Sequence, residues 1–285
     1  MLSIIIINHN TNKLCADCVR SVRESVDSLG YEIIIVDNSD DDNELFYSDG
    51  ADLKVIRCEN KGFGHACNIG AANASGKYLL MLNSDTAVDK GALDKCVLFL
   101  ENHSEAGAVG AKLMLPDGTM DHGCRRGFPT PSASFYYMLG FDKRHPENKK
   151  YGAYRLSYLP EDETCEVDVI SGAFLMTERS LYNEIGGFDE DFFMYGEDID
   201  LCYRIKETGR KIYFYPEATV LHLKGQSGLH TANRKIIYHF YKSMIIFYKK
   251  HYAKKYNIFV NGFIYLGIYA KLALSMVKSF FGGKK

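Results

Sequence analysis

Short runs of apolar, mostly β-branched residues alternate with helix-like stretches along the first third of the chain. The runs have the length of strands and are SIIIIN (3–8), YEIIIVDN (31–38), LKVIRC (53–58) and YLLMLNSD (78–85). Uninterrupted apolar runs of this kind are typical of strands buried on both faces. Helices are predicted from about residue 13 to 29, with Gly30 as the stop, and from about Gly64 onward. The pattern therefore predicts an α/β fold in which a mostly parallel sheet has helices on both faces.

The pattern is less regular in the middle of the chain and changes again near the end. Residues 116–165 hold five of the six prolines and many tyrosines, which indicates loops or a lid. A strand-like run at 167–176 and a helical stretch near 178–185 follow. From about residue 231 the sequence is aromatic, basic and helical in pattern. We therefore expect a main domain over 1–230 and a helical C-terminal segment over 231–285.

Polar residues gather where the predicted strands end. They are Asn8, Asn10, Asp37, Asn38, Asn60, Asn83 and Asp85. Ligands of parallel sheets bind beyond the carboxyl ends of the strands, so a binding site is expected at this edge. Asp85, assisted by Asn83 and Ser84, could hold a divalent ion against phosphate oxygens. Taken singly, the two aspartates have plainer explanations, because Asp37 also fits a turn and Asp85 a helix cap.

The segment NKGFGHACNIG (60–70) combines glycines with a predicted helix start. Free backbone amides and the positive end of a helix dipole at such a place suit a diphosphate. The segment is neither a P-loop nor a GxGxxG motif, and an ordinary strand-to-helix turn explains it equally well.

Acidic residues are densest between 189 and 200, where aromatic side chains separate them. The acidic members are Asp189, Glu190, Asp191, Glu197, Asp198 and Asp200. Carboxylates beside apolar groups are candidates for a raised pKa and for general-base catalysis. The alternative is an aromatic core segment followed by the acidic start of a helix. His222 follows further on, and together with Asp85 it can complete a metal site, although a lone histidine is more often structural.

Charge and cysteine content exclude other classes of function. With 34 basic and 36 acidic residues the formal charge is −2, so no overall basic field attracts nucleic acid. The eight cysteines contain one CxxC pair, Cys15 and Cys18, and no second pair that would complete a zinc site. Buried structural thiols are favoured over redox chemistry. The N-terminus has no basic segment and only a short apolar run, so we expect a cytoplasmic protein without a signal peptide.

Taken in order, seven motifs resemble family 2 inverting glycosyltransferases of the GT-A fold, in particular their rhamnosyltransferase-like branch. The motifs are SIIIINHN (3–10), VDNSDDD (36–42), NKGFGHACNIG (60–70), LNSD (82–85), SGAFLM (171–176), GGFDEDFFMYGEDIDLCYR (186–204) and HLKGQS (222–227). The resemblance spans about residues 1–251. It implies a nucleotide-sugar half over about 1–115 and an acceptor half over about 116–230 in one GT-A catalytic domain.

The resemblance also implies a role for each motif residue. Those expected at the nucleotide-sugar are Asn8, Asn10, Asp37, Asn60, Gly64, Asn68, Asn83 and Ser84, with Asp37 reading the pyrimidine. Asp85 matches the last aspartate of the metal-binding DxD motif and His222 a second metal or diphosphate contact, with Mg²⁺ or Mn²⁺ as the cofactor. Asn83 stands where the motif has its first aspartate, which weakens the expected metal affinity. Asp198 matches the catalytic base, and Glu197, Ser171 and Gly172 would lie on the acceptor side.

The implied reaction is inverting transfer of L-rhamnose from dTDP-rhamnose to a hydroxyl of a lipid-linked saccharide in cell-surface polysaccharide biosynthesis. The alternatives are a UDP-hexose or UDP-galactofuranose donor in the same family, and a non-catalytic membrane-associated scaffold. A sugar-1-phosphate nucleotidyltransferase is disfavoured, because residues 1–13 hold neither the glycine nor the arginine of a GxGxRxxP signature.

The C-terminal segment mixes lysine with aromatic and aliphatic residues. Its uncharged run, 258–270, has 13 residues, fewer than the ~20 that a membrane span requires. We therefore expect a segment that lies in the headgroup region of an anionic leaflet, with the protein peripheral on the inner face of the cell membrane. The alternative is that these helices pack on the catalytic domain or form a homodimer interface.

Overall fold

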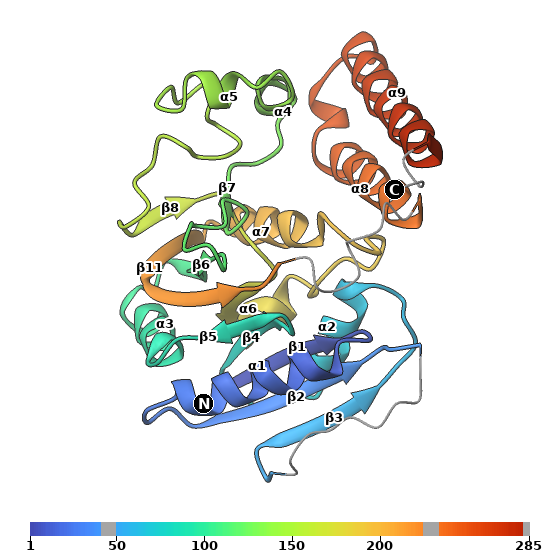
Figure 1. Ribbon diagram of the computed structural model, residues 1–285. Helices are drawn as coiled ribbons and strands as arrows, with labels where there is room; N and C mark the ends of the chain where they lie inside the picture. The colour runs from blue at the N-terminus through green and yellow to red at the C-terminus, as the bar shows by residue number, and fades with distance from the viewer. Residues whose placement is uncertain (41–49, 225–233, 282–285) are drawn as a thin grey trace.

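The computed structural model describes residues 1–40, 50–224 and 234–281 (Figure 1). Parts of three sequence predictions lie outside these residues. They are the end of the 36–42 motif, the end of the 222–227 motif and the first residues of the C-terminal segment.

A nine-stranded sheet forms the centre of the described structure, in the order β3-β2-β1-β4-β10-β6-β11-β5, with β8 paired to β11. The four predicted strands of the first third are present as β1 (Leu2–Asn8), β2 (Tyr31–Asp37), β3 (Leu53–Arg57) and β4 (Tyr78–Asn83). They run parallel to one another. Ile4, Ile5 and Ile6 of β1 are fully buried, as expected for a central strand covered on both faces.

The remaining strands make the sheet mixed. They are β5 (Thr86–Val88), β6 (Ala106–Met114), β8 (Cys165–Val167), β10 (Phe174–Glu178) and β11 (Lys211–His222). β10 lies antiparallel between β4 and β6, while β6 and β11 are parallel. The predicted strand at 167–176 is in fact broken, because β9 (Val169–Ile170) leaves the main sheet to pair with β7 (Arg125–Arg126). Most strands of the main sheet nevertheless point the same way, so the predicted fold class is confirmed.

Helices cover the sheet on both faces. They are α1 (Asn12–Ser25), α2 (Phe63–Ala72), α3 (Ala92–Asn102), α6 (Arg179–Glu184) and α7 (Glu197–Glu207). Figure 1 shows α1 crossing in front of β1 and β2. α1 ends at Ser25, before the predicted stop at Gly30, because Val26 already has extended backbone angles. Cys15 and Cys18 lie fully buried on α1 and are not joined in a disulfide, as predicted for structural cysteines.

Two further groups of helices stand at the end of the molecule away from β3 (Figure 1). The proline-rich region contains α4 (Pro131–Met138) and α5 (Phe141–Arg144). The C-terminal segment forms α8 (Arg234–His251), the short 3-10 helix η1 (Ala253–Lys255) and α9 (Ile258–Phe281). α8 and α9 pack against each other, and the hydroxyl groups of Tyr241 and Ser275 lie 2.9 Å apart between them.

α8 is fixed to α7 and the segment before it by a small core and by one buried carboxylate. Phe192 from the acidic segment is buried with Phe247, Tyr248 and Tyr252 in this second core. Asp200 of α7 is fully buried and is contacted by three cationic or ionisable groups, those of Arg204, Lys250 and His251.

The expectation that the C-terminal segment is too short to span a membrane is wrong, because α9 is longer than the uncharged run. The helix does not stop with the uncharged run but continues past Lys271 and Lys278. Ile258–Phe280 has a mean hydropathy of 1.5 and is unburied, so by length and composition it could cross a membrane.

Candidate active site

Asp37 ends β2 and is held there by Asn8, which ends β1 in register with it. The Asn8 amide nitrogen donates to Oδ1 of Asp37 at 2.9 Å and to Asn12 at 2.7 Å, while its oxygen accepts from Thr11. These bonds use both donors and both lone pairs of the amide. Asn8 therefore orients Asp37 through hydrogen bonds that engage its side-chain amide with protein groups.

The second oxygen of Asp37 lies 3.4 Å from Nε of Arg57, at the end of the neighbouring strand β3. Ser39 donates its hydroxyl to Oδ1 at 2.6 Å. Asn10 adopts a left-handed backbone with φ of 56° and exchanges hydrogen bonds with Asp40, so it stands at the same strand ends as predicted. Arg57 is the member of this group that sequence reasoning missed.

The start of α2 is joined to the acidic segment. The Phe63 amide donates to the Phe193 carbonyl at 3.1 Å. A Cβ on Gly62 would lie 2.3 Å from that carbonyl oxygen, and Gly62 has φ of 111°, so only glycine fits here. Gly64 is also buried, because its Cα faces Phe188 so closely that a Cβ would lie 3.0 Å from the Phe188 Cβ. Asn60 is exposed in the turn before the helix.

Asn68 has a structural role in the same contact. Its nitrogen donates to the Phe188 carbonyl and to Glu190, both at 2.9 Å, and its oxygen accepts from Tyr182 at 2.7 Å and from the Phe188 amide at 2.9 Å. The amide is saturated by protein groups. These hydrogen bonds fasten residues 188–190 to α2.

Asp85 and His222 are brought together from separate strands, as predicted for a shared site. Antiparallel pairing of β5 and β11 places His222 opposite Thr86, next to Asp85. Nε2 of His222 lies 3.4 Å from Oδ1 of Asp85, and both residues are buried. Ser84 is also buried and its hydroxyl lies 3.0 Å from that of Thr11.

Asp121 completes this group and was missed by sequence reasoning. Its Oδ2 lies 3.2 Å from Nδ1 of His222, and its Oδ1 accepts from Lys224 at 2.6 Å. Burial alone would lower the pKa of His222, but its contacts with Asp121 and Asp85 raise that pKa to about 9. Because Asp121 occupies Nδ1, it leaves Nε2 directed to the Asp85 side, an arrangement typical of metal-ligating histidines.

The Asp85 site fits a divalent cation that receives part of its ligands from a bound phosphate group. Oδ1 of Asp85 is buried and has no hydrogen-bond partner among the described residues. The Asp85 carboxylate, whose Oδ1 lies 3.4 Å from Nε2 of His222, is a suitable ligand, and so is the imidazole once Nε2 has lost its proton. No group of three or more protein ligands occurs in the described parts of the chain, so phosphate oxygens would have to supply the remaining contacts.

Asp198 lies in the first turn of α7, where helix amides and the dipole favour a carboxylate. It is 8% exposed, and its Oδ2 accepts from Nη2 of Arg126 at 2.5 Å and from the Gly172 amide at 3.4 Å. A Cβ on Gly172 would lie 3.3 Å from the Phe63 ring and 3.7 Å from the Asp198 Cβ, so glycine permits this close approach. Asp198, the expected catalytic base, and Gly172, expected on the acceptor side, are therefore neighbours.

Glu197 is buried beside Asp198 with its Oε2 unpartnered in the described structure. Burial, followed by the charge of Asp198, raises the pKa of Glu197 well above its usual range. The two adjacent carboxyl groups therefore differ in character: Asp198 is ion-paired, whereas Glu197 tends to be protonated at neutral pH.

The residues around Asp85 and those around Asp198 are connected through the backbone. The backbone N–H of Asn83 donates to the Ala173 carbonyl at 3.1 Å, and this bond joins the LNSD motif to the SGA motif. The Ser171 hydroxyl accepts from the Ala173 amide at 3.2 Å and so fixes the same turn. The strand end that carries Asp85 is thus held against the turn that contacts Asp198.

Arg126 is expected to position the Asp198 carboxylate. Replacing it by Met should lower kcat by about 10–100-fold, because a small displacement of a reacting group has a large effect on rate. Arg126→Lys keeps the charge but loses the planar fork, so an intermediate loss is expected. Donor affinity, measured separately by thermal shift, should be unchanged in both variants. A fall in donor affinity with kcat preserved would contradict this role.

Two family models match successive parts of the chain. Residues 3–157 match the family model described as glycosyl transferase family 2, and residues 162–226 match the model of the N-terminal domain of galactosyltransferase. The chain is 32% identical over 172 residues to an N-acetylglucosaminyl-diphospho-decaprenol L-rhamnosyltransferase of Mycobacterium tuberculosis, covering 60% of this chain and 54% of that protein. It is 27% identical over 234 residues to rhamnosyltransferase WbbL of Escherichia coli, covering 78% and 83%. The chain thus spans about half the length of the mycobacterial relative.

Solved structures share the fold. The mannosyltransferase PcManGT of Pyrobaculum calidifontis, in complex with GDP-Man and Mn²⁺, gives a TM-score of 0.56 at 16% identity and covers 100% of this chain and 76% of that one. GalNAc-T7 with UDP, GalNAc and Mn²⁺ gives 0.54 at 18% identity, covering 78% and 43%. At this level of identity the likeness shows the fold alone.

Proposed function

The chain belongs to glycosyl transferase family 2, and from this premise we propose that it moves L-rhamnose from dTDP-β-L-rhamnose to a hydroxyl of a lipid-linked saccharide, with inversion at the anomeric carbon. The observation that carries the proposal is the pair of buried carboxyl groups at the start of α7, with Arg126 and Gly172 directed at Asp198. The choice of rhamnose is supported by the two relatives named as rhamnosyltransferases.

In the proposed reaction Asp198 takes the proton of the acceptor hydroxyl as the oxygen attacks the anomeric carbon. Arg126 and the Gly172 amide hold Asp198 in one orientation. The C1–O bond to the nucleoside diphosphate breaks as the new glycosidic bond forms on the opposite face. Negative charge grows on the leaving diphosphate and has to be offset by positive charge at the site.

Asp37 is the proposed reader of the pyrimidine, with Asn10, Asn60, Asn83 and Ser84 around the nucleotide-sugar. Asp85 and His222 would hold Mg²⁺ or Mn²⁺, which supplies positive charge to the leaving diphosphate when bound. Asp121 keeps the His222 ring in one orientation.

The donor is tested by thermal shift in the presence of Mn²⁺. A ligand that binds the folded state raises its stability by RT ln(1 + [L]/Kd), so at about 100 times Kd the correct donor adds about 2.7 kcal/mol. We expect dTDP-rhamnose to exceed UDP-glucose, UDP-galactose and UDP-GlcNAc, and to be transferred to a lipid-linked acceptor. If a UDP-sugar stabilises the protein and dTDP-rhamnose does not, the rhamnose proposal is refuted, while glycosyl transfer from another donor still stands.

A UDP-hexose or UDP-galactofuranose donor is the second candidate. The match of residues 162–226 to the galactosyltransferase N-terminal domain favours it. The same comparison of donors distinguishes a rhamnosyltransferase from a UDP-sugar-dependent transferase. A non-catalytic scaffold would transfer no sugar from any donor.

We further place the protein at the inner face of the cell membrane. The exposed, apolar α9 supports this position, because its outer face has no partner in the described structure and its length suits a membrane contact. A lipid-linked acceptor would then lie in the same leaflet as the enzyme.

A further inference from the structure

Helix α4 presents an exposed apolar face at the end of the molecule opposite β3 (Figure 1). Phe135, Met138 and Leu139 are spaced three and four residues apart, which puts them on one side of the helix. They are 47%, 50% and 50% exposed. Single apolar residues are common on surfaces, whereas neighbouring ones, here two on α4 and Leu139 directly after it, form a patch suited to a contact with another molecule. The proposed glycosyl transfer does not use this face.

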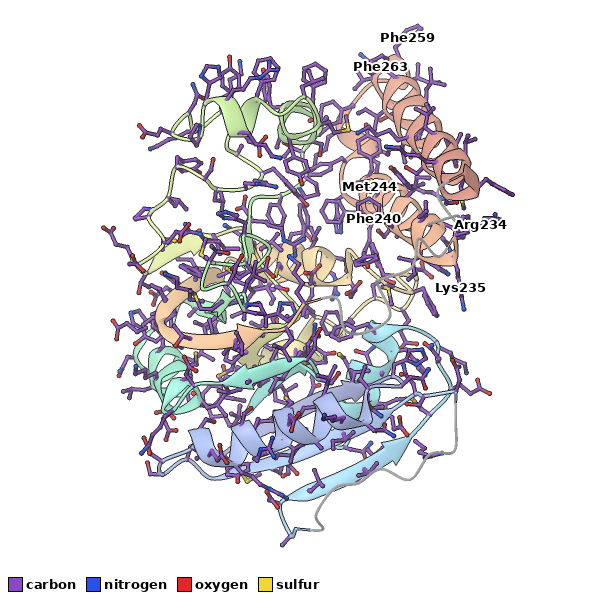
Figure 2. All side chains as sticks on the ribbon, viewed as in Figure 1. Arg234, Lys235, Phe240, Met244, Phe259 and Phe263 are labelled. Atoms are coloured by element: carbon purple, nitrogen blue, oxygen red, sulfur yellow. The ribbon has the colours of Figure 1, made fainter. Side chains whose placement is uncertain are left out.

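The beginning of α9 presents a second apolar face. Ile258, Phe259 and Phe263 are 78%, 85% and 74% exposed. Figure 2 shows Phe259 and Phe263 at the outer end of the α8–α9 pair, with Arg234 and Lys235 at the opposite end of α8. The most exposed aromatic residues therefore lie at the same end of the molecule as α4.

The two faces are held in a fixed relation by a shared core. Phe128 precedes α4 by three residues, and its ring lies 4.9 Å from that of Tyr203 on α7. Phe128 and Tyr203 both pack on the buried cluster that contains Phe247 and Tyr252. The chain that leads into α4 is thus anchored on the same residues as the end of α8.

The charges around these faces are basic. No acidic residue follows Glu217, so neither α8 nor α9 carries a carboxylate side chain. Lys254 and Lys255 are exposed just before α9. Beside α4, four basic residues are exposed against the single exposed Glu147, and these are Lys143, Arg144, Lys149 and Lys150. Apolar side chains bordered by lysine and arginine match an anionic lipid surface, which offers acyl chains below a layer of negative headgroups.

We propose that the α4 face and the start of α9 dock together on an anionic lipid bilayer, so that α4 is a second membrane contact besides the C-terminal helix. A second copy of the chain is a poorer occupant, because two basic rims would then oppose each other. The inference goes beyond the proposed function and does not depend on which sugar is transferred.

Docking in this way would bring the catalytic carboxylate close to the lipid. Arg126, which binds Asp198, lies five residues before α4 begins. Five extended residues span at most about 18 Å. An acceptor that projects from the bilayer surface would therefore have only a short distance to reach Asp198.

Single tryptophans can test the α4 contact directly, because the chain contains no Trp. Met138→Trp and Phe259→Trp should each show a blue shift in emission when phosphatidylglycerol vesicles are added, and a smaller one with phosphatidylcholine. Leu98→Trp is the matched control, since Leu98 is 57% exposed on α3, away from α4 and α9 (Figure 1). A shift at residue 259 without one at residue 138 would refute the two-helix contact.

Vesicle flotation supplies the second measurement. The triple change Phe135→Ser, Met138→Ser and Leu139→Ser should lower partition to phosphatidylglycerol vesicles about tenfold, as should Phe259→Ser with Phe263→Ser, while Leu98→Ser should not. Unchanged flotation of the α4 variant overturns the proposal. A second result would also overturn it: sedimentation could show that the wild type is a dimer and the α4 variant a monomer. The α4 face would then join two copies of the chain. Donor-induced thermal shifts in the same variants should match the wild type, which separates this result from a failure of the proposed function.

Discussion

Asp198→Asn is expected to lower kcat by about 10²–10⁴-fold, the usual effect of losing a general base. The change keeps the size of the side chain and its contacts with Arg126 and Gly172 on one oxygen, but it removes the group that accepts the acceptor proton. Donor affinity should remain near the wild-type value, because Asp198 lies on the acceptor side. Single-turnover transfer together with a separate binding measurement would show the two effects.

Two neighbouring carboxylates provide the controls. Asp200→Asn should reduce stability rather than the chemical step, since Asp200 is fully buried among Arg204, Lys250 and His251. Glu197→Gln should keep more activity than Asp198→Asn. In Asp198→Asn the pKa of Glu197 should fall, because the charge of Asp198 is one cause of its elevation. Near-wild-type turnover of Asp198→Asn would transfer the role of base to Glu197.

Asp85→Ala and His222→Ala are expected to weaken metal-dependent donor binding by about 10–100-fold, the range reported for changes in the surroundings of metal sites. Asp85→Ala removes the buried oxygen that has no other partner in the described structure. Exhaustive treatment with EDTA should slow the wild type and be reversed by Mn²⁺ or Mg²⁺. Thermal shift with the donor, with and without the metal, gives the measurement.

Lys224→Ala is a suitable comparison for these variants. Lys224 contacts Asp121 but neither Asp85 nor the metal-facing side of His222. It should therefore affect donor binding less than either proposed ligand. Full activity of the wild type after chelation would contradict the metal proposal. It would mean that protein groups bind the diphosphate without a metal.

The central strands were predictable because their burial follows from composition. A run such as SIIIIN can be stable only between two layers, and its parallel neighbours are of the same kind. The interruption at residues 167–176 was not predictable, since it depends on β9 pairing with Arg125 and Arg126 from a distant, irregular region. That same pairing brings Arg126 to Asp198, so the sequence offered no local signal for this partner.

The motif residues differ in what their side chains contact: some meet at a candidate ligand site, and others are engaged by protein groups. Asp85 and His222 do meet across β5 and β11, as the resemblance implied. Asn8 and Asn68 stand in motifs just as clearly, yet their amides are fully engaged with protein groups. A motif alone does not distinguish a side chain that contacts a ligand from one that holds such a side chain in place. Counting donors and acceptors in the folded chain does.

The contacts of Asp200 make α7 a mechanical link between the two ends of the molecule. The first turn of this helix carries both the proposed base, Asp198, and Asp200, which contacts Lys250 and His251 at the end of α8. A force or tilt applied to the α8–α9 pair would therefore be transmitted to the helix that carries Asp198. Any shortened chain must extend past His251, because ending it earlier would leave the buried Asp200 carboxylate without two of its three partners.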